Sequence, residues 1–585
     1  MCRVLGLPPL LAGLMLLGLL PGTAVRNPQA LRAQDVEERS PASAAPSPSV
    51  NLQATVYGAA GEVSGSLTIL QTGRGRWMID CGAVYPGGPG TAQQRIGRAE
   101  QATAQLPAAA RQIDGLLITH AHLDHLGRVP LLVDSGFAGP IYLTQITADL
   151  ADVMLAMQVR FDRERIRAWT WSKRSLEQAG NSKRALLVHW QACPYRQSMS
   201  LENAETVRCS QRELQARFEA PPQGIKISLC RACADEEAAR VRRQYRIVPY
   251  GRPVALAPGV QATFFDAGHI PGSASILLEV QGTPSRRVLF SGDLGNPLSA
   301  LFCGPQPGPR ADAVFIEATY GAARREPAVA HQREEFRKAL GTAVAEHGVV
   351  WVPAFALDRT QKILYEIRLA QQQGLLRAAL PVYCPSPSAM AVTGIYQRHR
   401  SSGCFRPEVA TEETPWQVPG LRKTVPSYLP RPCILISPSD MTVSQWSQRL
   451  LDKQLPQAST SVFLVGYQDP LGEAGLLKAG ARELQVAGRT IPVAATIRDW
   501  SCFTGHGDAA DIDAWLANQE PRASTVILMH GEPEELQARA AELRRRWARV
   551  IVASSGEPIA LNDLKPGRCA EPEPAATPAA RTTVR

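Results

Sequence analysis

The sequence predicts an α/β fold in which short buried strands alternate with helices and carry metal-binding side chains at their ends. Residues 115–119 and 349–355 are apolar runs of strand length, whereas 334–346 and 360–373 have the length of helices. Three histidines and an aspartate follow the first run within six consecutive residues, 120–125. Because open α/β sheets bind ligands where their strands emerge, this cluster is the expected functional site.

The composition is that of an ordered globular protein with several domains. The chain has 585 residues, 45% of them hydrophobic and 20% charged, and this length favours two to four domains. The net charge of +10 and the pI near 9.1 favour an anionic partner such as nucleic acid. A surplus this small over such a length also fits an ordinary solvated surface.

The N-terminus has the pattern of a secretory signal. Arg3 precedes an apolar segment over 4–20 and a small-residue exit at 21–24, so we expect residues 1–24 to be removed and the protein exported, to the periplasm or outside the cell. Alternatives are an uncleaved anchor, because the apolar length approaches the ~17–20 residues of a membrane span, or a start codon placed too far upstream, which would make the protein cytoplasmic. The sequence contains no second long apolar segment, so we expect no integral membrane partner.

Linkers should flank the ordered chain. Residues 25–50 lack periodicity and end rich in Pro, Ser and Ala, and 563–585 resemble a disordered tail. The ordered chain should begin near Asn51, with strands over 67–70 and 77–82. Asp80 falls at the end of the second strand, where it can brace the histidine cluster; a turn-capping aspartate is the alternative.

The cluster itself has the composition of a metal site. In an extended chain, residues 120, 122 and 124 share one side while residue 125 points elsewhere, so the segment can address two neighbouring ions. Imidazole nitrogen and carboxylate oxygen are ligands for zinc, manganese and iron. A polar surface loop rich in histidine is the other interpretation.

A strand over 139–144 and a helix over 147–158 should follow, and then a polar, Arg-rich region at about 160–243. This region contains four cysteines, Cys193, Cys209, Cys230 and Cys233. They could form a structural zinc site if the protein is cytosolic, or two disulfides if it is exported. Unrelated buried thiols are the third possibility.

Two later strand ends carry further candidate ligands. The strand after residue 260 ends on His269 in a glycine-rich turn, and the strand after residue 287 ends on Asp293. Together with the cluster they supply a third protein ligand for each of two ions and a carboxylate able to bridge both.

These motifs resemble the metallo-β-lactamase superfamily, and specifically its β-CASP branch of nucleic-acid hydrolases. The resemblance rests on Asp80, the run at 120–125, His269 and Asp293, followed by the stretches 316–321, 502–508 and 528–532. Segments 58–66, 352–361 and 465–468 also look like that branch, and the likeness runs in order from 51 to about 560.

The resemblance implies an αββα sandwich with an inserted α/β domain, the β-CASP domain. The expected boundaries are 51–321 and 489–562 for the sandwich and 322–488 for the insertion, with a strand at 491–497 returning to the sandwich. The inserted domain departs from the family at 437–443, where a loop containing Asp440 replaces a glycine-rich stretch, and an acidic residue facing a cleft would repel RNA.

The resemblance also implies the site. One zinc ion is expected at His120, His122, His269 and Asp293, and the second at Asp124, His125, Asp293 and His530, with other divalent ions as alternatives. Two such ions activate a hydroxide between them. His506, paired with Glu317, would be the general acid for the leaving ribose oxygen, and Asp124 and Asp80 complete the expected catalytic set.

The function implied is therefore a zinc-dependent phosphodiesterase, in particular an endoribonuclease for single-stranded RNA. Histidine at position 530 goes with RNA-acting members of the branch, and we expect no additional C-terminal domain of the kind found in RNase J-type exonucleases. The alternatives are an exported hydrolase of another phosphodiester or ester and a non-catalytic nucleic-acid-binding scaffold. A homodimer is one possible assembly.

Overall fold

The computed structural model describes residues 51–86, 92–161, 206–208, 226–228, 238–325, 329–346, 348–438, 445–466, 468, 471–486, 488–519 and 525–562. The predicted signal, the linker, the tail and the four clustered cysteines lie outside these ranges. The described residues belong to one compact unit. None of their helices combines the length and the apolarity needed to cross a membrane.

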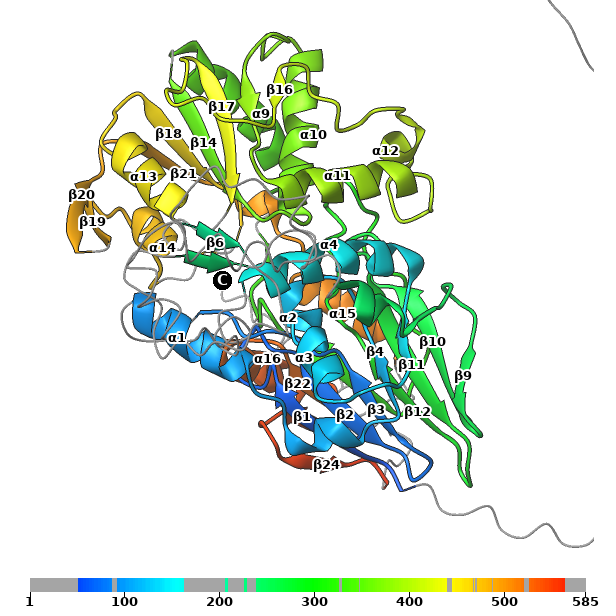
Figure 1. Ribbon diagram of the computed structural model, residues 1–585. Helices are drawn as coiled ribbons and strands as arrows, with labels where there is room; N and C mark the ends of the chain where they lie inside the picture. Colours follow the sequence, from blue (N-terminus) through cyan, green and yellow to red (C-terminus); the bar gives the residue numbers. More distant parts are fainter. Residues whose placement is uncertain are drawn as a thin grey trace, which may run out of the picture. The chain divides into compact units, whose positions relative to one another are not determined.

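Two mixed seven-stranded sheets pack face to face and form the sandwich domain (Figure 1). In spatial order, the first sheet contains β24 (Pro558–Ala560), β1 (Gln53–Gly58), β2 (Leu67–Gln71), β3 (Arg76–Ile79), β4 (Gly115–Leu117), β5 (Ile141–Leu143) and β8 (Tyr245–Ile247). The second contains β23 (Val550–Val552), β22 (Thr525–Met529), β13 (Ala313–Glu317), β12 (Arg286–Phe290), β11 (Ala274–Val280), β10 (Val260–Asp266) and β9 (Val254–Ala257).

Strand alternation produces this layering, because successive side chains of a strand point to opposite faces of its sheet. On β4, Leu117 packs in the core between the two sheets with Phe264 and Phe290, while Leu116 packs on the outer face. The outer face of the first sheet is covered by α2 (Leu123–Leu126), α3 (Val129–Asp134) and α4 (Gln145–Phe161). Helices α15 (Ala509–Ala517) and α16 (Pro533–Leu543) cover the second sheet. The predicted αββα sandwich is confirmed.

The inserted domain contains a six-stranded parallel sheet. In the sequence it lies between β13 and β22, and these two strands pair with each other in the sandwich. Its strands in spatial order are β16 (Leu421–Arg422), β15 (Val382–Tyr383), β17 (Cys433–Pro438), β14 (Val349–Ala354), β18 (Thr460–Leu464) and β21 (Thr496–Asp499). One face packs on α9 (Val329–Ala345), α10 (Arg359–Gln372) and α11 (Pro387–His399), and the other on α13 (Gln445–Gln454) and α14 (Glu473–Lys478). The helices expected at 147–158, 334–346 and 360–373 correspond to α4, α9 and α10.

The prediction that a strand over 491–497 returns to the sandwich is wrong. The segment contains two strands: β20 (Arg489–Pro492) forms a hairpin with β19 (Glu483–Val486), and β21 pairs in parallel with β18 of the inserted sheet. Gly488, with φ of 77°, forms the tight hairpin turn. Apolar alternation predicts that a strand exists but not which strand it pairs with. The sheet to which this segment belongs could therefore not be read from its own residues.

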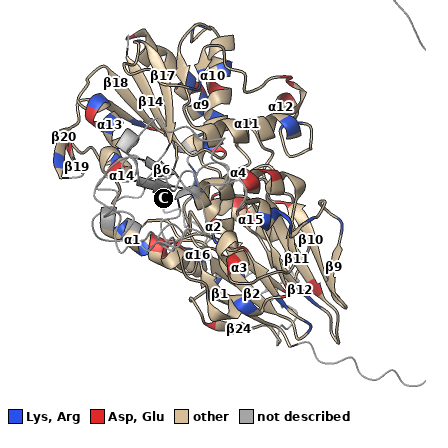
Figure 2. Cartoon of the chain, viewed as in Figure 1, with Lys and Arg blue, Asp and Glu red and all other residues tan. Residues whose placement is uncertain are grey.

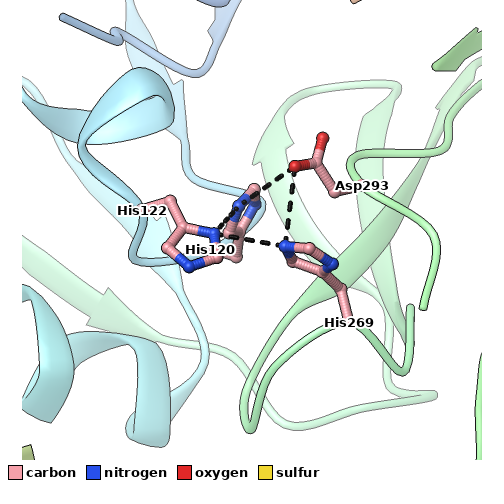
Figure 3. A group of neighbouring side chains, drawn as sticks. All are labelled: His120, His122, His269 and Asp293. Carbon is pink, nitrogen blue, oxygen red and sulfur yellow. Dashed lines mark hydrogen bonds and ion pairs between the residues drawn. The ribbon is translucent and has the colours of Figure 1, made fainter. Parts of the chain in front are cut away.

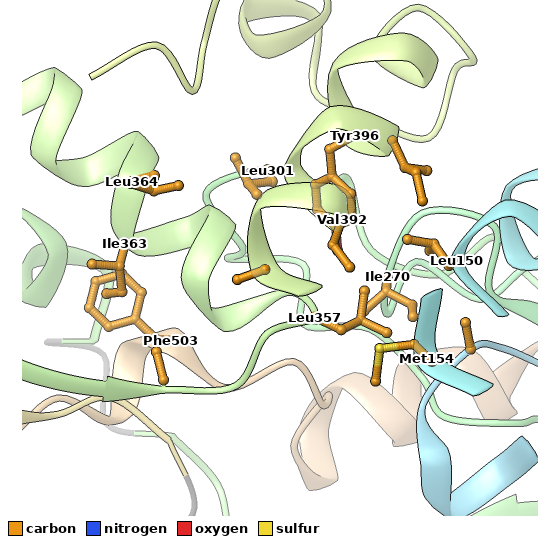
Figure 4. Close-up of a cluster of buried hydrophobic side chains, with 14 of the residues drawn as sticks. Leu150, Met154, Ile270, Leu301, Leu357, Ile363, Leu364, Val392, Tyr396 and Phe503 are labelled. Atoms are coloured by element: carbon orange, nitrogen blue, oxygen red, sulfur yellow. The ribbon is translucent and has the colours of Figure 1, made fainter. Parts of the chain in front are cut away.

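A continuous apolar core joins the two domains and fixes the loops that meet between them. Leu357 of the inserted domain lies in the same buried cluster as Ile270 and Met154 of the sandwich (Figure 4). Polar contacts add to this core, since the backbone amide of Arg406 donates to the carbonyl of Leu301 at 2.8 Å. The strand ends of the sandwich are therefore held against the loops of the inserted sheet.

Candidate metal centre

Seven nitrogen- and oxygen-bearing side chains converge from separate strand ends and from α2. His120 lies just beyond β4, His269 beyond β10, Asp293 beyond β12 and His530 directly after β22. The remaining three come from the start of α2: His122, Asp124 and His125. Side chains that are up to 410 residues apart in sequence thus meet at one edge of the sandwich, as expected for an α/β ligand site.

The histidine run is not extended throughout, and this corrects the predicted geometry. His122 is the N-cap residue of α2, and Asp124 and His125 lie on the helix itself. Asp124 is therefore grouped with His125 and not with His120 and His122. A run this short gives no helical periodicity, so the sequence could not predict that the chain turns here.

The first group comprises His120, His122, His269 and Asp293, whose side chains point toward a common centre (Figure 3). Nδ1 of His122 lies 3.0 Å from Nε2 of His120 and 3.1 Å from Nε2 of His269. Oδ2 of Asp293 lies 3.5 Å and 3.6 Å from the same two Nε2 atoms. Four ligands at ~2.0–2.1 Å from one zinc ion stand about 3.3 Å apart at the corners of a tetrahedron, so these separations fit one ion.

The second group comprises Asp124, His125 and His530 and also faces Asp293. Nε2 of His125 lies 3.1 Å from Nε2 of His530, and Oδ2 of Asp124 lies 3.6 Å from the latter. Oδ1 of Asp293 lies 3.3 Å from Nε2 of His125 and 3.7 Å from that of His530. Asp293 thus turns one oxygen to each group, which is the geometry of a bridging carboxylate.

The chemistry of the donors also fits metal ions. Burial lowers the pKa of His120 and His269 well below the ordinary value and that of His122 to about 4, so the three histidines of the first group are neutral at pH 7. Neutral ring nitrogens that face one another cannot all be satisfied by hydrogen bonds. Among the described residues, the buried Oδ1 of Asp293 makes no hydrogen bond of acceptable geometry.

A carboxylate beneath the cluster orients it. Asp80, at φ of 58°, accepts hydrogen bonds from the Thr119 amide at 2.8 Å and from Nδ1 of His125 at 2.7 Å. Burial lowers the pKa of His125, but the carboxylates of Asp293 and Asp80 outweigh burial and raise that pKa well above its ordinary value. This position therefore attracts positive charge, which either a proton or a metal ion can supply. Asp80 lies where the sequence places a bracing residue.

Two threonine hydroxyls fix further imidazole rings, a role that was not among the sequence predictions. Thr119 donates to Asp80, and its oxygen lies 3.0 Å from Nδ1 of His120. Thr319 donates to Glu317 at 2.5 Å, and its oxygen lies 3.0 Å from Nδ1 of His530. Each hydroxyl can accept the Nδ1 proton, which leaves Nε2 unprotonated toward the centre. Thr119 directly precedes the run at 120–125 and Thr319 lies within the motif stretch 316–321, and these positions were the available signal.

The predicted His506 and Glu317 pair is formed at the rim of the centre. Nδ1 of His506 lies 3.1 Å from Oε2 of Glu317 and 3.9 Å from Oδ2 of Asp293. Burial lowers the pKa of His506, but Glu317 and Asp293 outweigh it and raise that pKa above the ordinary value. His506 retains 19% side-chain exposure, whereas Glu317 is buried. The ring is therefore oriented by its carboxylate and remains open to a substrate.

Tyr85 is a further neighbour of the centre, and no sequence pattern predicts this position. Its hydroxyl donates to Oδ1 of Asp124 at 3.2 Å. No motif surrounds it, and its position depends on how the loop after β3 returns to α2. Cys193, Cys209, Cys230, Cys233 and Asp440 lie outside the described residues, so the predictions for them stay predictions.

Three family profiles match the chain in the order expected from the fold. The metallo-beta-lactamase superfamily matches residues 60–188, the Beta-Casp domain 360–474, and the Zn-dependent metallo-hydrolase RNA specificity domain 490–553. The first and third matches fall mainly on the sandwich domain, and the second falls on the inserted domain.

Curated relatives cover most of the chain. Ribonuclease TTHA0252 of Thermus thermophilus is 28% identical over 516 residues, which are 86% of this chain and 98% of the relative. Transcription termination factor FttA of Methanosarcina mazei is 23% identical, over 82% of this chain and 67% of its own length. An RNase J-like protein of Methanocaldococcus jannaschii is 23% identical, over 81% and 91%. With its metallo-β-lactamase and Beta-Casp domains, the chain belongs to the β-CASP branch of the metallo-β-lactamase superfamily.

Proposed function

We propose that the protein is a zinc-dependent endoribonuclease that hydrolyses single-stranded RNA. The observation that carries this proposal is the convergence of two ligand groups on Asp293, with the His506 and Glu317 pair beside them. The family profile for zinc-dependent metallo-hydrolases with RNA specificity and the ribonuclease among the relatives support RNA as the substrate.

When bound, two zinc ions would lower the pKa of a water molecule to about 7 and stabilise negative charge on the phosphate oxygens. The first ion would be held by His120, His122, His269 and Asp293, and the second by Asp124, His125, His530 and Asp293. The protein positions these ligands through Asp80 and the two threonine hydroxyls, which set the ring orientations before substrate binds.

His506 is the proposed general acid. Its Nδ1–H can donate to Glu317, so its Nε2 is free to deliver a proton to the leaving ribose oxygen. Glu317 is itself fixed, because its Oε1 accepts from the Leu294 amide at 2.6 Å and its Oε2 from the Thr319 hydroxyl. The carboxylate stabilises the protonated ring, and this matches the raised pKa of His506.

Substrate choice must come from specific residues more than from overall charge. Figure 2 shows Lys and Arg interspersed with Asp and Glu over both domains in this view. Helix α13, for example, carries Arg449 and Lys453 beside Asp452. Charges of both signs are therefore mixed over the described part of the chain, and overall charge does not by itself define an RNA path there.

The test is digestion of an end-labelled single-stranded RNA by the zinc-loaded protein. We expect internal cleavage that is abolished in Asp124→Ala and reduced by about 10²–10⁴ in His506→Ala, since general acid catalysis contributes that factor. His331→Ala is the matched control, because His331 is an exposed histidine of α9 outside the centre. Folded, zinc-loaded protein that leaves RNA intact but hydrolyses another phosphodiester or ester would replace this proposal with the alternative substrate.

We also propose that the protein is exported after removal of residues 1–24. The support is the apolar segment at 4–20 with its small-residue exit. Sequencing the N-terminus of the secreted or periplasmic protein should give a chain that starts near Val25. An intact Met1 in a cytoplasmic fraction would overturn export, and structural zinc would then be the better prediction for the four clustered cysteines.

A further inference from the structure

The loop between β14 and α10 presents two residues that the proposed catalytic machinery does not use, Phe355 and Arg359. Strand β14 lies between β17 and β18, and its carboxyl end is where a parallel α/β sheet binds ligands. The loop is firmly anchored, because Leu357 is 2% exposed within the core that joins the two domains (Figure 4).

The guanidinium group of Arg359 is available for an anion. Among the described residues, no acceptor pairs with its Nε or Nη1, although both atoms are buried. The carboxylate next to it in sequence, Asp358, is instead engaged by Lys362, whose Nζ lies 2.7 Å from Oδ2. Buried N–H groups without acceptors are costly, and a guanidinium fork matches the oxygens of a phosphate.

A glycine leaves room for this group at the end of the adjacent strand. A β-carbon at Gly466, two residues after β18 ends, would lie 3.4 Å from Nε of Arg359 and 3.6 Å from its Cζ. The guanidinium therefore lies beside Gly466 at the carboxyl edge of β14 and β18, where residue 466 has no side chain to cover it.

Phe355 supplies an aromatic surface on the same loop. Half of its surface is exposed, whereas Ala354 before it is buried. Its carbonyl accepts hydrogen bonds from the amide of Thr360 at 3.1 Å and from its hydroxyl at 2.7 Å, so the backbone that carries the ring is fixed. A pre-positioned, exposed aromatic ring can stack on a nucleobase, and such stacking tolerates any base.

The loop lies next to the metal centre. A β-carbon at Gly505 would lie 3.2 Å from Nδ1 of His269 and 3.7 Å from Oδ2 of Asp358. The Asp358 carboxylate of the β14–α10 loop and the His269 ring of the first ligand group thus both lie against Gly505, the residue before His506.

We propose that Phe355 and Arg359 form a subsite for one nucleotide of single-stranded RNA, in which Phe355 stacks on the base and Arg359 binds a phosphate. This inference rests on the proposed function, because it assigns the subsite to the substrate proposed there. The subsite holds the strand beside the metal centre without reading its sequence.

The experiment measures the affinity of the full chain for a fluorescent single-stranded RNA over a range of salt concentrations, in the His506→Ala background to prevent cleavage. Arg359→Ala should reduce the slope of log K against log salt by about 0.7, the contribution of one phosphate contact on a single strand. Arg359→Lys keeps the charge and should keep the slope. The control Arg377→Ala removes an exposed arginine elsewhere in the same domain and should leave the slope unchanged.

Phe355→Ala should weaken binding about tenfold. Tyr428→Ala is its control, because Tyr428, at 78%, is the most exposed aromatic among the described residues of the inserted domain. RNAs that each carry one abasic position test the stacking directly. One of these abasic RNAs should bind more weakly than the intact RNA to the protein that retains Phe355. The Phe355→Ala variant should bind that abasic RNA and the intact RNA equally well.

The outcomes separate the two proposals. If the wild-type protein cleaves RNA but Phe355→Ala and Arg359→Ala bind RNA like their controls, the subsite is wrong and the proposed function stands. If both variants lose affinity as described but the wild-type protein cleaves no RNA, the subsite stands and the nuclease does not. Absence of RNA binding by the wild-type chain would overturn the subsite.

Discussion

Thr319→Val tests whether one hydroxyl couples the proposed general-acid pair to the second metal site. Valine has the shape of threonine, so the variant removes the hydrogen bond to Glu317 and the contact with Nδ1 of His530 but leaves the packing in place. Each buried polar group that loses its partner costs about 1–3 kcal/mol. Loss of a residue that orients a metal-ligating histidine lowers metal affinity about 10–100-fold.

The assay is a zinc titration with a competing chelator, in which two binding steps are resolved. We expect Thr319→Val to weaken one step by about 10–100-fold and to leave the other within about threefold, because only His530 of the second group depends on this hydroxyl. Thr319→Ser retains the hydroxyl and should bind zinc like the wild-type protein. Two unchanged binding steps in a folded Thr319→Val protein would refute the coupling.

Three further predictions concern stability. Glu366 is fully buried and paired with Arg333 and Arg337, so Glu366→Ala should lower the unfolding free energy by about 3–5 kcal/mol. Lys338→Ala removes an exposed ion pair and should have a much smaller effect in the same urea titration. Burial raises the pKa of Asp266 to about 6, so the folded state holds its proton more tightly than the unfolded state and stability should fall as pH rises from about 4 to about 6. Asp266→Asn should remove this fall and be up to about 3 kcal/mol more stable at pH 7, and an unchanged pH profile would contradict the assignment. Chelation of zinc should lower the melting temperature, readdition should restore it, and equal melting temperatures would speak against metal bound in the folded state.

The residues of the metal centre could be predicted because its ligands either lie close together in the sequence or follow the ends of predicted strands. Residues 120–125 supply four of them, and His269 and Asp293 follow strands whose apolar runs are clear. The long helices α4, α9 and α10 could also be predicted, since their length distinguishes them from strands. These features depend on local sequence alone.

What could not be predicted depends on partners distant in the chain. The pairing of β21 with β18, the helical turn that groups Asp124 with His125, and the contact of Tyr85 with Asp124 leave no local pattern. Thr319 lies in a motif, but its role depends on His530, 211 residues further along. A strand or a turn can be identified from its own residues, whereas its neighbour is chosen by packing of the whole domain.

The most direct test of the central claim is the zinc content of the purified full chain and of Asp293→Ala, measured by elemental mass spectrometry after dialysis. Because Asp293 turns one oxygen to each ligand group, the wild-type protein should hold two ions per chain, and folded Asp293→Ala should hold fewer than one. Two ions retained without the Asp293 carboxylate would contradict a shared centre.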